Sequence, residues 1–375
     1  MIAADRSLVS VSDSVLYVAF ELSATQWKLA MTSGFGVPPA LRTVRAADWP
    51  AVERALGWGR AHLGLAPEGP TVSCYEAGRD GFWIHRALVT RGVANRVVDS
   101  SSIEVTRRAR RMKTDRLDAL KLVRMLVRVC LGERRVWNDV RVPSEAAEAA
   151  RHVSRERQAL IAERTRLVNQ MRSWLVTSGT ALPARVDGAW WDGVRDWQGH
   201  PLPRPVQQRL ARAQARLVLL AEQLAVIDEA QRTVLQTAPA ASAARRLLQL
   251  KGVAVTSISI LLDEGLLWRE FANRRQLGGL LGFAPCRAES GEVSRDQGIS
   301  RAGNDRLQSV MVQLAWSWVH WQPHSALTQW YVTRFGQGTR ARKVGIVALA
   351  RKLLIALWRW ATQRVLPAGA ILKSA

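Results

Sequence analysis

The chain has few cysteines, and its apolar runs are short. Its three cysteines, Cys74, Cys130 and Cys286, lie far apart and form no Cys-x-x-Cys pair. A disulfide framework and a zinc knuckle are therefore excluded, and this cysteine usage suits a reducing cytoplasm. The most apolar stretch, residues 344–358, is interrupted by two cations and is too short to span a bilayer. No basic segment followed by an apolar one opens the chain, so no secretory signal is predicted.

Tyrosine and histidine are also scarce, which narrows the possible chemistry. The three tyrosines are Tyr17, Tyr75 and Tyr331, and the first two fall in predicted strands, which argues against a tyrosine recombinase. The six histidines show no ligand spacing such as His-Glu-x-x-His. The sequence therefore predicts no histidine-based metal centre.

Acidic residues are few relative to basic ones. The chain has 31 Asp and Glu against 54 Lys and Arg, which gives a formal net charge of +23. Such an excess of cations indicates a polyanionic partner, and nucleic acid is the partner we expect. The 16 tryptophans fit this partner, because aromatic rings among cations can stack on bases. Packing in the core is the alternative role for these rings.

The first 143 residues predict an α/β domain with a mixed sheet. Apolar stretches bounded by Gly and Pro indicate strands at 15–21, 27–32, 40–44, 71–76 and 95–98. Helical patterns cover 48–63, 81–91 and 110–131, with Asp48 as the expected N-cap of the first helix. Three successive strands followed by alternating helices and strands are typical of an α/β fold.

Residues 144–240 predict a long helical hairpin. Residues 144–176 lack Gly and Pro, as in a long helix, whereas the Gly- and Pro-containing segment 183–205 predicts a loop. Beyond this loop a heptad seam recurs at spacings of four and three, is broken at Gln231 and resumes at Val234. The seam consists of Val206, Leu210, Ala213, Leu217, Leu220, Leu224 and Ile227. Such a coiled-coil seam packs either within the chain or against a second copy in a dimer.

Residues 241–375 predict a third domain of mostly short helices and loops. Residues 250–256 (Leu-Lys-Gly-Val-Ala-Val-Thr) resemble the turn of a helix-hairpin-helix, in which backbone N–H groups at a helix N-terminus meet a phosphate. A tight turn between two packed helices is the alternative interpretation of this segment.

Four carboxylates form the first candidate site. Glu21 and Glu76 each end a predicted strand, while Asp115 and Asp118 lie three residues apart, which places both on one face of a helix. Converging carboxylates bind hard divalent cations such as Mg²⁺, and paired Mg²⁺ ions can hold the attacking and leaving oxygens of a phosphodiester exchange. Nine cations crowd the same segment, namely Arg107, Arg108, Arg110, Arg111, Lys113, Arg116, Lys121, Arg124 and Arg128. Ordinary ion pairs between these cations and the acids are the alternative.

Ser290 is the second candidate site. It precedes Gly291 in a segment predicted to be a flexible, polar loop, with Arg287, Arg295 and Arg301 nearby. A serine hydroxyl attacks phosphorus only where it is activated and exposed, and a loop allows both. An ordinary loop serine is the alternative.

Five motifs in this order resemble the transposases of the IS110 insertion-sequence family, which are bridge-RNA-guided DEDD recombinases. They are residues 75–83 (Tyr-Glu-Ala-Gly-Arg-Asp-Gly-Phe-Trp), 113–119 (Lys-Thr-Asp-Arg-Leu-Asp-Ala), 281–285 (Leu-Gly-Phe-Ala-Pro), 289–291 (Glu-Ser-Gly) and 299–304 (Ile-Ser-Arg-Ala-Gly-Asn). Each motif alone is weak, whereas five in sequence along most of the chain are specific.

The resemblance implies an N-terminal RuvC-like domain with a ribonuclease H fold, a coiled-coil linker and a C-terminal domain with a nucleophilic serine. It implies that Glu21, Glu76, Asp115 and Asp118 hold Mg²⁺ and that Ser290 is the nucleophile. The family usually has Asp at the first position, so the longer arm of Glu21 would shift the metal. DNA and a guide RNA are the implied partners, in an assembly of two or four copies.

The sequence as a whole predicts a cytoplasmic, nucleoid-associated DNA transposase that cuts and rejoins strands through a phosphoserine intermediate, with Mg²⁺ assisting. One alternative is a metal-dependent nuclease or junction resolvase that hydrolyses DNA with water and forms no covalent intermediate. A second alternative is a non-enzymatic nucleic-acid-binding scaffold with a decayed acid site. No membrane partner is expected.

Overall fold

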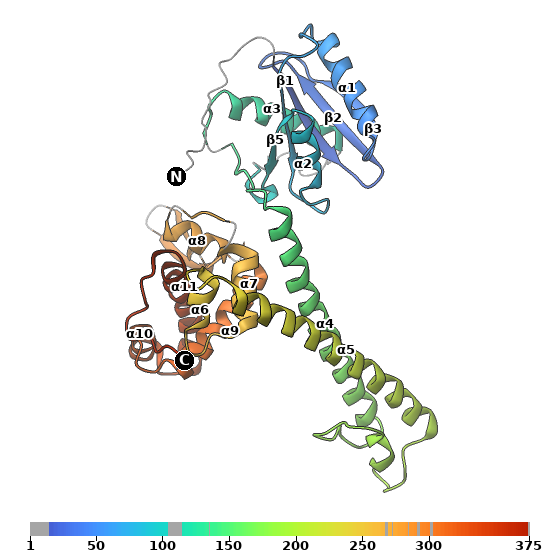
Figure 1. Ribbon diagram of the computed structural model, residues 1–375, viewed down its shortest axis with the longest axis vertical. Coiled ribbons are helices and arrows are strands. Elements are labelled where there is room, and N and C mark those ends of the chain that lie inside the picture. The colour runs from blue at the N-terminus through green and yellow to red at the C-terminus, as the bar shows by residue number, and fades with distance from the viewer. Residues whose placement is uncertain are drawn as a thin grey trace. The chain divides into compact units, whose positions relative to one another are not determined.

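The chain divides into two compact units, Met1–Pro143 and Ser144–Ala375. A computed structural model is the basis of the description (Figure 1). The residues that the structure describes are 15–103, 115–134, 136–266, 269–271, 273–283, 285–290, 293–300 and 303–373.

The first unit is built on a five-stranded mixed sheet with the strand order β3-β2-β1-β4-β5. Its strands are β1 (Leu16–Leu22), β2 (Gln26–Thr32), β3 (Ala40–Arg45), β4 (Thr71–Glu76) and β5 (Ala94–Val98). Strands β1, β2 and β3 pair antiparallel through short turns. Strands β1, β4 and β5 run parallel, which requires longer crossover connections, and these contain helices.

Helices cover both faces of this sheet (Figure 1). α1 (Trp49–His62) and α2 (Trp83–Thr90) pack on one face, and α3 (Asp115–Cys130) packs on the other. Even-numbered residues 16–20 of β1 join the core beneath α1 and α2, whereas odd-numbered residues 15–19 join the core beneath α3. Because side chains alternate between faces along a strand, this period of two also tells which face the strand's last residues occupy.

The strands and helices expected for the first unit are confirmed, and their ends shift by one or two residues. Asp48 caps α1 as predicted, since its Oδ1 accepts a hydrogen bond from the backbone N–H of Ala51 at 2.9 Å. A short 3-10 turn, η1 (Ser100–Ser102), follows β5. Residues 110–114 of the expected helix 110–131 lie outside the described residues, and α3 is described from Asp115 onward.

The second unit begins with two long helices that pack against each other (Figure 1). They are α4 (Glu145–Val176) and α5 (Arg204–Thr237), and the 3-10 helix η3 (Trp190–Gly193) lies in their connection. Arg157, near the start of α4, pairs with Asp228, near the end of α5. The last turns of α4 share a core with the first turns of α5. The two helices are therefore antiparallel, and the predicted helical hairpin is confirmed.

The apolar seam of α5 changes its partner near its C-terminal end. All seven residues of the predicted seam are buried or half-buried. The predicted break at Gln231 is wrong, because Gln231 is only 8% exposed and continues the buried stripe. The predicted resumption at Val234 is wrong, because Val234 is 67% exposed while Leu235 is 4% exposed. Leu235 belongs to the core of the C-terminal helices rather than to the hairpin. The buried stripe moves by one residue because a different element covers it.

The rest of the second unit is mostly helical and surrounds one core. Its helices are α6 (Ala243–Leu248), α7 (Val255–Leu261), the π-helical turn η4 (Leu262–Leu266), α8 (Arg274–Leu280), α9 (Asp305–Trp321), α10 (Ala326–Phe335) and α11 (Thr339–Gln363). The expectation of mostly short helices is wrong for α9 and α11, which have 17 and 25 residues. The apolar run 344–358 lies in α11, where it packs in this core. None of the helices described is long and apolar enough to cross a bilayer.

A tight turn joins α6 and α7, as the helix-hairpin-helix interpretation of residues 250–256 requires. Gly252 in this turn has a φ of +82°, a conformation that favours glycine. A Cβ added to it would lie 2.8 Å from the Cβ of Trp321. The turn therefore requires glycine both for its backbone conformation and for its close approach to α9. Phosphate binding by this turn remains a prediction.

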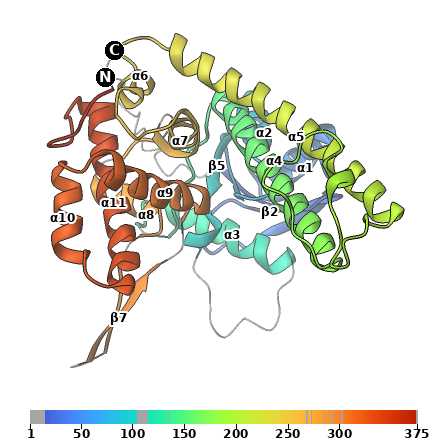
Figure 2. The same cartoon turned by 90° about the horizontal axis from the view of Figure 1, so that it is seen from below.

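Two strands, β6 (Pro285–Ser290) and β7 (Val293–Ile299), form an antiparallel hairpin that projects from the helices of the second unit (Figure 2). The flexible loop expected around Ser290 is therefore wrong: Ser290 is the last residue of β6 and pairs with Val293. This hairpin has few apolar residues, so the alternation that indicates a strand is weak in its sequence. Hydrogen bonds between the backbones of the two strands form this hairpin, and the sequence of either strand alone does not indicate them.

Candidate functional site

Two of the predicted carboxylates lie at the ends of neighbouring parallel strands. The pairing of β1 with β4 ends at Phe20 and Tyr75, so Glu21 and Glu76 follow directly at the same edge of the sheet. Both lie one residue beyond a side chain that faces the core beneath α1 and α2. The period of two therefore turns both carboxylates toward the face that α3 covers. They also line one cavity of about 410 Å³.

The other two predicted carboxylates lie in the first turn of α3, on this same face of the sheet. The Nζ of Lys28 lies 3.4 Å from the Oδ2 of Asp115. Lys28 is in turn the cross-strand partner of Glu21 in the pairing of β1 with β2. Lys28 thus connects the strand end that carries Glu21 with the helix turn that carries Asp115 and Asp118.

The four carboxylates share an edge and a face of the sheet, but they do not form one coordination sphere. Among the described residues, no three His, Cys, Asp or Glu side chains lie close enough together to hold a metal ion. The donor chemistry nevertheless fits a hard divalent cation, because all four residues offer carboxylate oxygens. Asp115 and Asp118 are exposed and half-exposed, so their side chains can rotate toward an ion.

Two residues close to the carboxylates, Asp80 and Lys28, were not predicted from the sequence. Asp80 lines the same cavity as Glu21 and Glu76, and its Oδ1 lies 3.3 Å from the Nη2 of Arg79. Asp80 lies in the motif 75–83, but its sequence position in a turn is equally typical of an aspartate that only faces solvent. The sequence therefore did not indicate it as a site residue. Lys28 was missed because its contact with Asp115 joins residues 87 positions apart.

The cations predicted to surround the acids divide into two groups. Arg116, Lys121, Arg124 and Arg128 lie on α3. Arg107, Arg108, Arg110, Arg111 and Lys113 lie outside the described residues, as does Arg301 near Ser290. Their expected roles therefore remain predictions. The structure places Ser290 at the end of β6. Its role as a nucleophile also remains a prediction.

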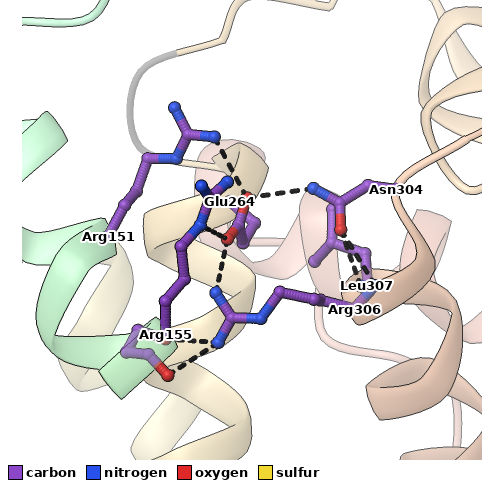
Figure 3. A network of polar contacts seen from close by, with 7 residues as sticks. Arg151, Arg155, Glu264, Asn304, Arg306 and Leu307 are labelled. Carbon is purple, nitrogen blue, oxygen red and sulfur yellow. Dashed lines mark hydrogen bonds and ion pairs between the residues drawn. The ribbon is translucent and has the colours of Figure 1, made fainter. Parts of the chain in front are cut away.

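A buried ion network in the second unit is the strongest polar cluster that the sequence analysis missed (Figure 3). The Glu264 side chain in η4 is fully buried. Its Oε1 accepts hydrogen bonds from Arg155 at 3.2 Å and Arg306 at 2.6 Å. Its Oε2 accepts from Asn304 at 2.9 Å and from Arg151 at 3.5 Å. One carboxylate therefore joins α4, η4 and the start of α9.

Electrostatics in this network keep Glu264 ionised. Burial by itself raises the pKa of Glu264, but hydrogen bonds from Arg155 and Asn304 and the charge of Arg151 outweigh burial and lower that pKa. The adjacent Asp263 shows the opposite balance, since burial and the charge of Glu264 raise the pKa of Asp263 to about 7 against the opposing arginines. Near neutral pH Glu264 is thus ionised while Asp263 titrates, because hydrogen bonds and positive charge outweigh burial at Glu264, whereas burial and the charge of Glu264 dominate at Asp263.

The network also fixes the chain between the β-hairpin and α9. Asn304 caps α9, because its Oδ1 accepts from the backbone N–H groups of Arg306 and Leu307, each at 3.1 Å. The backbone N–H of Asn304 donates to the carbonyl of Leu280 at 2.8 Å. Before it in the chain, the Ser300 hydroxyl donates to the carbonyl of Gly282 at 3.1 Å. The segment that follows β7 is therefore tied to the helical core on both sides of residues 301–302.

Comparisons with known proteins agree on one class of protein. The model of the transposase IS116/IS110/IS902 family matches residues 244–329, and a transposase model for the DEDD domain of IS110 elements matches residues 51–178. The second match includes Glu76, Asp115 and Asp118, and the first includes Ser290; Glu21 lies outside both.

Whole sequences give the same result. A protein of Sinorhizobium fredii whose name describes it as a transposase, y4rJ, is 38% identical over 98% of this chain and 96% of its own length. The transposase for insertion sequence element IS1328 of Yersinia enterocolitica is 28% identical over 59% of this chain and 65% of its own length. The similarity to the first of these relatives thus extends across both units.

Proposed function

The chain belongs to the IS116/IS110/IS902 family of transposases and is a DNA transposase, and we propose that it cuts and rejoins DNA strands through a covalent phosphoserine intermediate. The observation that carries the cutting step is the gathering of Glu21, Glu76, Asp115 and Asp118 at one edge and on one face of the sheet. The phosphoserine step rests on the family resemblance of the motif around Ser290. We propose further that the sheet and its helices are a RuvC-like, ribonuclease H type domain, which the strand order supports. Its place of action is the cytoplasm, at the nucleoid.

Domains of the DEDD transposase type use divalent metal ions, and we propose Mg²⁺ as the ion that these four carboxylates hold. When bound, the ion supplies positive charge that polarises the scissile phosphate. The protein's own part is to orient the carboxylates. β1 and β4 fix the backbones of Glu21 and Glu76, α3 fixes those of Asp115 and Asp118, and Lys28 restrains Asp115.

Ser290 is the nucleophile in this proposal. Its Oγ forms a bond to phosphorus as the bond from phosphorus to the leaving DNA oxygen breaks. The serine proton is released and the leaving oxygen gains one, so the step conserves a phosphodiester. The joining step is the reverse, in which a DNA hydroxyl attacks the phosphoserine. The position of Ser290 at the end of β6, in a hairpin that projects from the helices, supports this role (Figure 2).

The serine step has a direct test. Replacing Ser290 with Ala is expected to abolish a covalent protein–DNA adduct while metal-dependent DNA retention stays within about twofold, because only the attacking hydroxyl is lost. A denaturing gel after incubation with a suicide DNA substrate shows the adduct as a shifted band. Ser294→Ala in the facing strand β7 is the matched control and should form the band. A band with Ser290→Ala would place the nucleophile elsewhere, and cleavage without any band in the parent would favour a hydrolytic nuclease.

We also propose that the protein works with a guide RNA. A net charge of +23 exceeds what a DNA contact of about 6–10 phosphates uses, so part of it is available to a second polyanion. Structured RNA is bound through its shape, its backbone and stacking on aromatic or Arg planes. We propose that two or four copies of the chain form the assembly. The seam of α5 packs against α4 within the chain, so it is not the surface that would join the copies.

Sequencing the RNA that co-purifies with the protein tests this partner. The expected result is one enriched species transcribed from beside the gene, and loss of recombination by more than about tenfold after ribonuclease treatment, because the guide selects the DNA. A broad mixture of cellular RNA with full activity after ribonuclease would indicate non-specific retention by a basic protein. In that case the protein recombines DNA without a guide.

A further inference from the structure

A groove of about 790 Å³ lies beside α3 in the first unit. One wall is the turn between β2 and β3, residues 33–39, which is apolar and contains Phe35. The other wall is the stripe of α3 that includes Lys121, Arg124 and Arg128. None of the described residues that line the groove is acidic. Its electrostatic character is therefore cationic on one side and apolar on the other.

The turn holds Phe35 in solvent. The Phe35 side chain is 77% exposed, the largest exposure among the large apolar side chains that the structure describes. The turn beneath it is anchored by the buried hydroxyl of Thr32, which lies 3.1 Å from the carbonyl oxygens of both Gly34 and Val37. The same hydroxyl accepts a hydrogen bond from the backbone N–H of Gly34 at 3.3 Å. Gly36 follows with a φ of +85°, where glycine is favoured.

An aromatic ring presented in this way suits a planar ligand. Val37 of the same turn and Leu117 of α3 also line the groove and are 38% and 45% exposed, so Phe35 belongs to an exposed apolar patch, which marks a binding surface. A nucleobase offers a flat face that stacks on an aromatic side chain. In a duplex this face is covered by the neighbouring base pairs, so stacking on Phe35 requires an unpaired base.

The cations on the opposite wall can bind the phosphates of the nucleic-acid strand whose base stacks on Phe35. Lys121, Arg124 and Arg128 recur at spacings of three and four, so they form one stripe along α3. At 1.5 Å per residue, this stripe begins about 4.5 Å along the helix from Asp118 and ends about 15 Å from it. The Nε of Arg128 also donates to Glu133 at 2.7 Å, so part of the charge of Arg128 is already paired.

We propose that this groove binds a single-stranded nucleic-acid segment that leaves the carboxylate site, with an unpaired base stacked on Phe35 and its phosphates on Lys121 and Arg124. The proposal rests on the proposed function, since it takes the carboxylate site as the place where a strand is cut. It adds the form of the substrate: an unpaired strand that runs along α3 from the cut to the turn between β2 and β3, which lies at the opposite end of β1 from Glu21. Stacking and charge bind this strand without sequence readout.

Photocrosslinking of the full-length protein tests where the strand lies. A single-stranded oligonucleotide with one 5-iododeoxyuridine is irradiated with the protein, and tryptic peptides are mapped by mass spectrometry. The expected product is a crosslink in residues 29–42, the tryptic peptide that contains Phe35. Crosslinks only in other peptides would overturn the proposal.

Binding measurements with matched variants test how the strand is held. Phe35→Ala is expected to weaken single-strand binding about 5- to 150-fold and to leave binding of the same sequence as a duplex within about twofold. Phe35→Trp should restore binding, whereas Phe35→Leu should not, because only the first restores an aromatic face. Equal binding by Phe35→Leu and the parent would indicate an apolar ligand such as a peptide or a second copy of the chain, and would overturn the proposal.

A charge-matched pair of variants tests the cationic wall. Arg124→Gln should reduce the slope of log binding constant against log salt by about 0.7, the value for one phosphate of a single strand. Arg54→Gln, an exposed arginine on α1 at the opposite face of the sheet, should not change this slope. Equal slopes for both variants would overturn the proposal. The two proposals fail in different ways. Unchanged single-strand binding by Phe35→Ala and Arg124→Gln would refute the groove alone, whereas unchanged cleavage by Asp118→Ala would refute the carboxylate site.

Discussion

Replacing Asp118 with Ala is expected to reduce metal-dependent DNA cleavage by more than about a hundredfold. Groups that only support a metal ligand already contribute about 10- to 100-fold, and Asp118 is proposed as a ligand itself. Without it the ion has one carboxylate fewer, so the ion is displaced from the scissile phosphate. Cleavage of a labelled substrate in Mg²⁺ measures the effect.

The fold should tolerate this change. Asp118 is half-exposed in the first turn of α3, where a carboxylate contributes about 0.3–1 kcal/mol through the helix dipole. Alanine recovers part of that by its higher helix propensity. Glu53→Ala is the matched control, since it removes an exposed carboxylate, paired with Arg91, from the opposite face of the sheet. Parental cleavage by Asp118→Ala, or equal losses in both variants, would contradict the metal-site proposal.

The sequence predicted the elements of this site because their signals are local. Apolar runs that end in Glu21 and Glu76 place both residues at strand ends, and the spacing of Asp115 and Asp118 places them on one helix face. That these three elements meet at one edge depends on parallel pairing of β1 with β4, which no local pattern specifies. The resemblance to the transposase family supplied that step.

The second unit shows where local signals mislead. The heptad seam predicted the hairpin, but not that Leu235 leaves it for the core of the C-terminal helices. α9 and α11 were missed as long helices although their buried residues recur at spacings of three and four, as at Leu307, Val310 and Leu314 of α9. The strands beside Ser290 were missed because cross-strand pairing, rather than alternation, defines them. For the seam, it is contact with a distant part of the chain that decides which residue is buried.

The Glu264 network is the clearest such case, and its members span more than 150 positions of the chain. Replacing Glu264 with Ala is expected to lower the free energy of unfolding of the second unit by about 3–5 kcal/mol. The reason is that the carboxylate that accepts from Arg151, Arg155 and Arg306 is lost, so these like charges stay close together with less negative charge to offset them (Figure 3). Urea unfolding followed by tryptophan fluorescence measures the change.

Asp228→Ala is the matched control, because it also removes a carboxylate that pairs with an arginine of α4. The pair Arg157–Asp228 is partly exposed, at 21% and 35%, so its loss should cost about 1 kcal/mol or less. Hydrogen exchange then locates the effect: Glu264→Ala should expose backbone amides of α9 near Asn304, whereas Asp228→Ala should not. Equal destabilisation by both variants would mean that burial adds nothing to the Glu264 network. A loss confined to Glu264→Ala would show that one carboxylate holds α9 against α4, and with it the base of the hairpin whose first strand ends at Ser290.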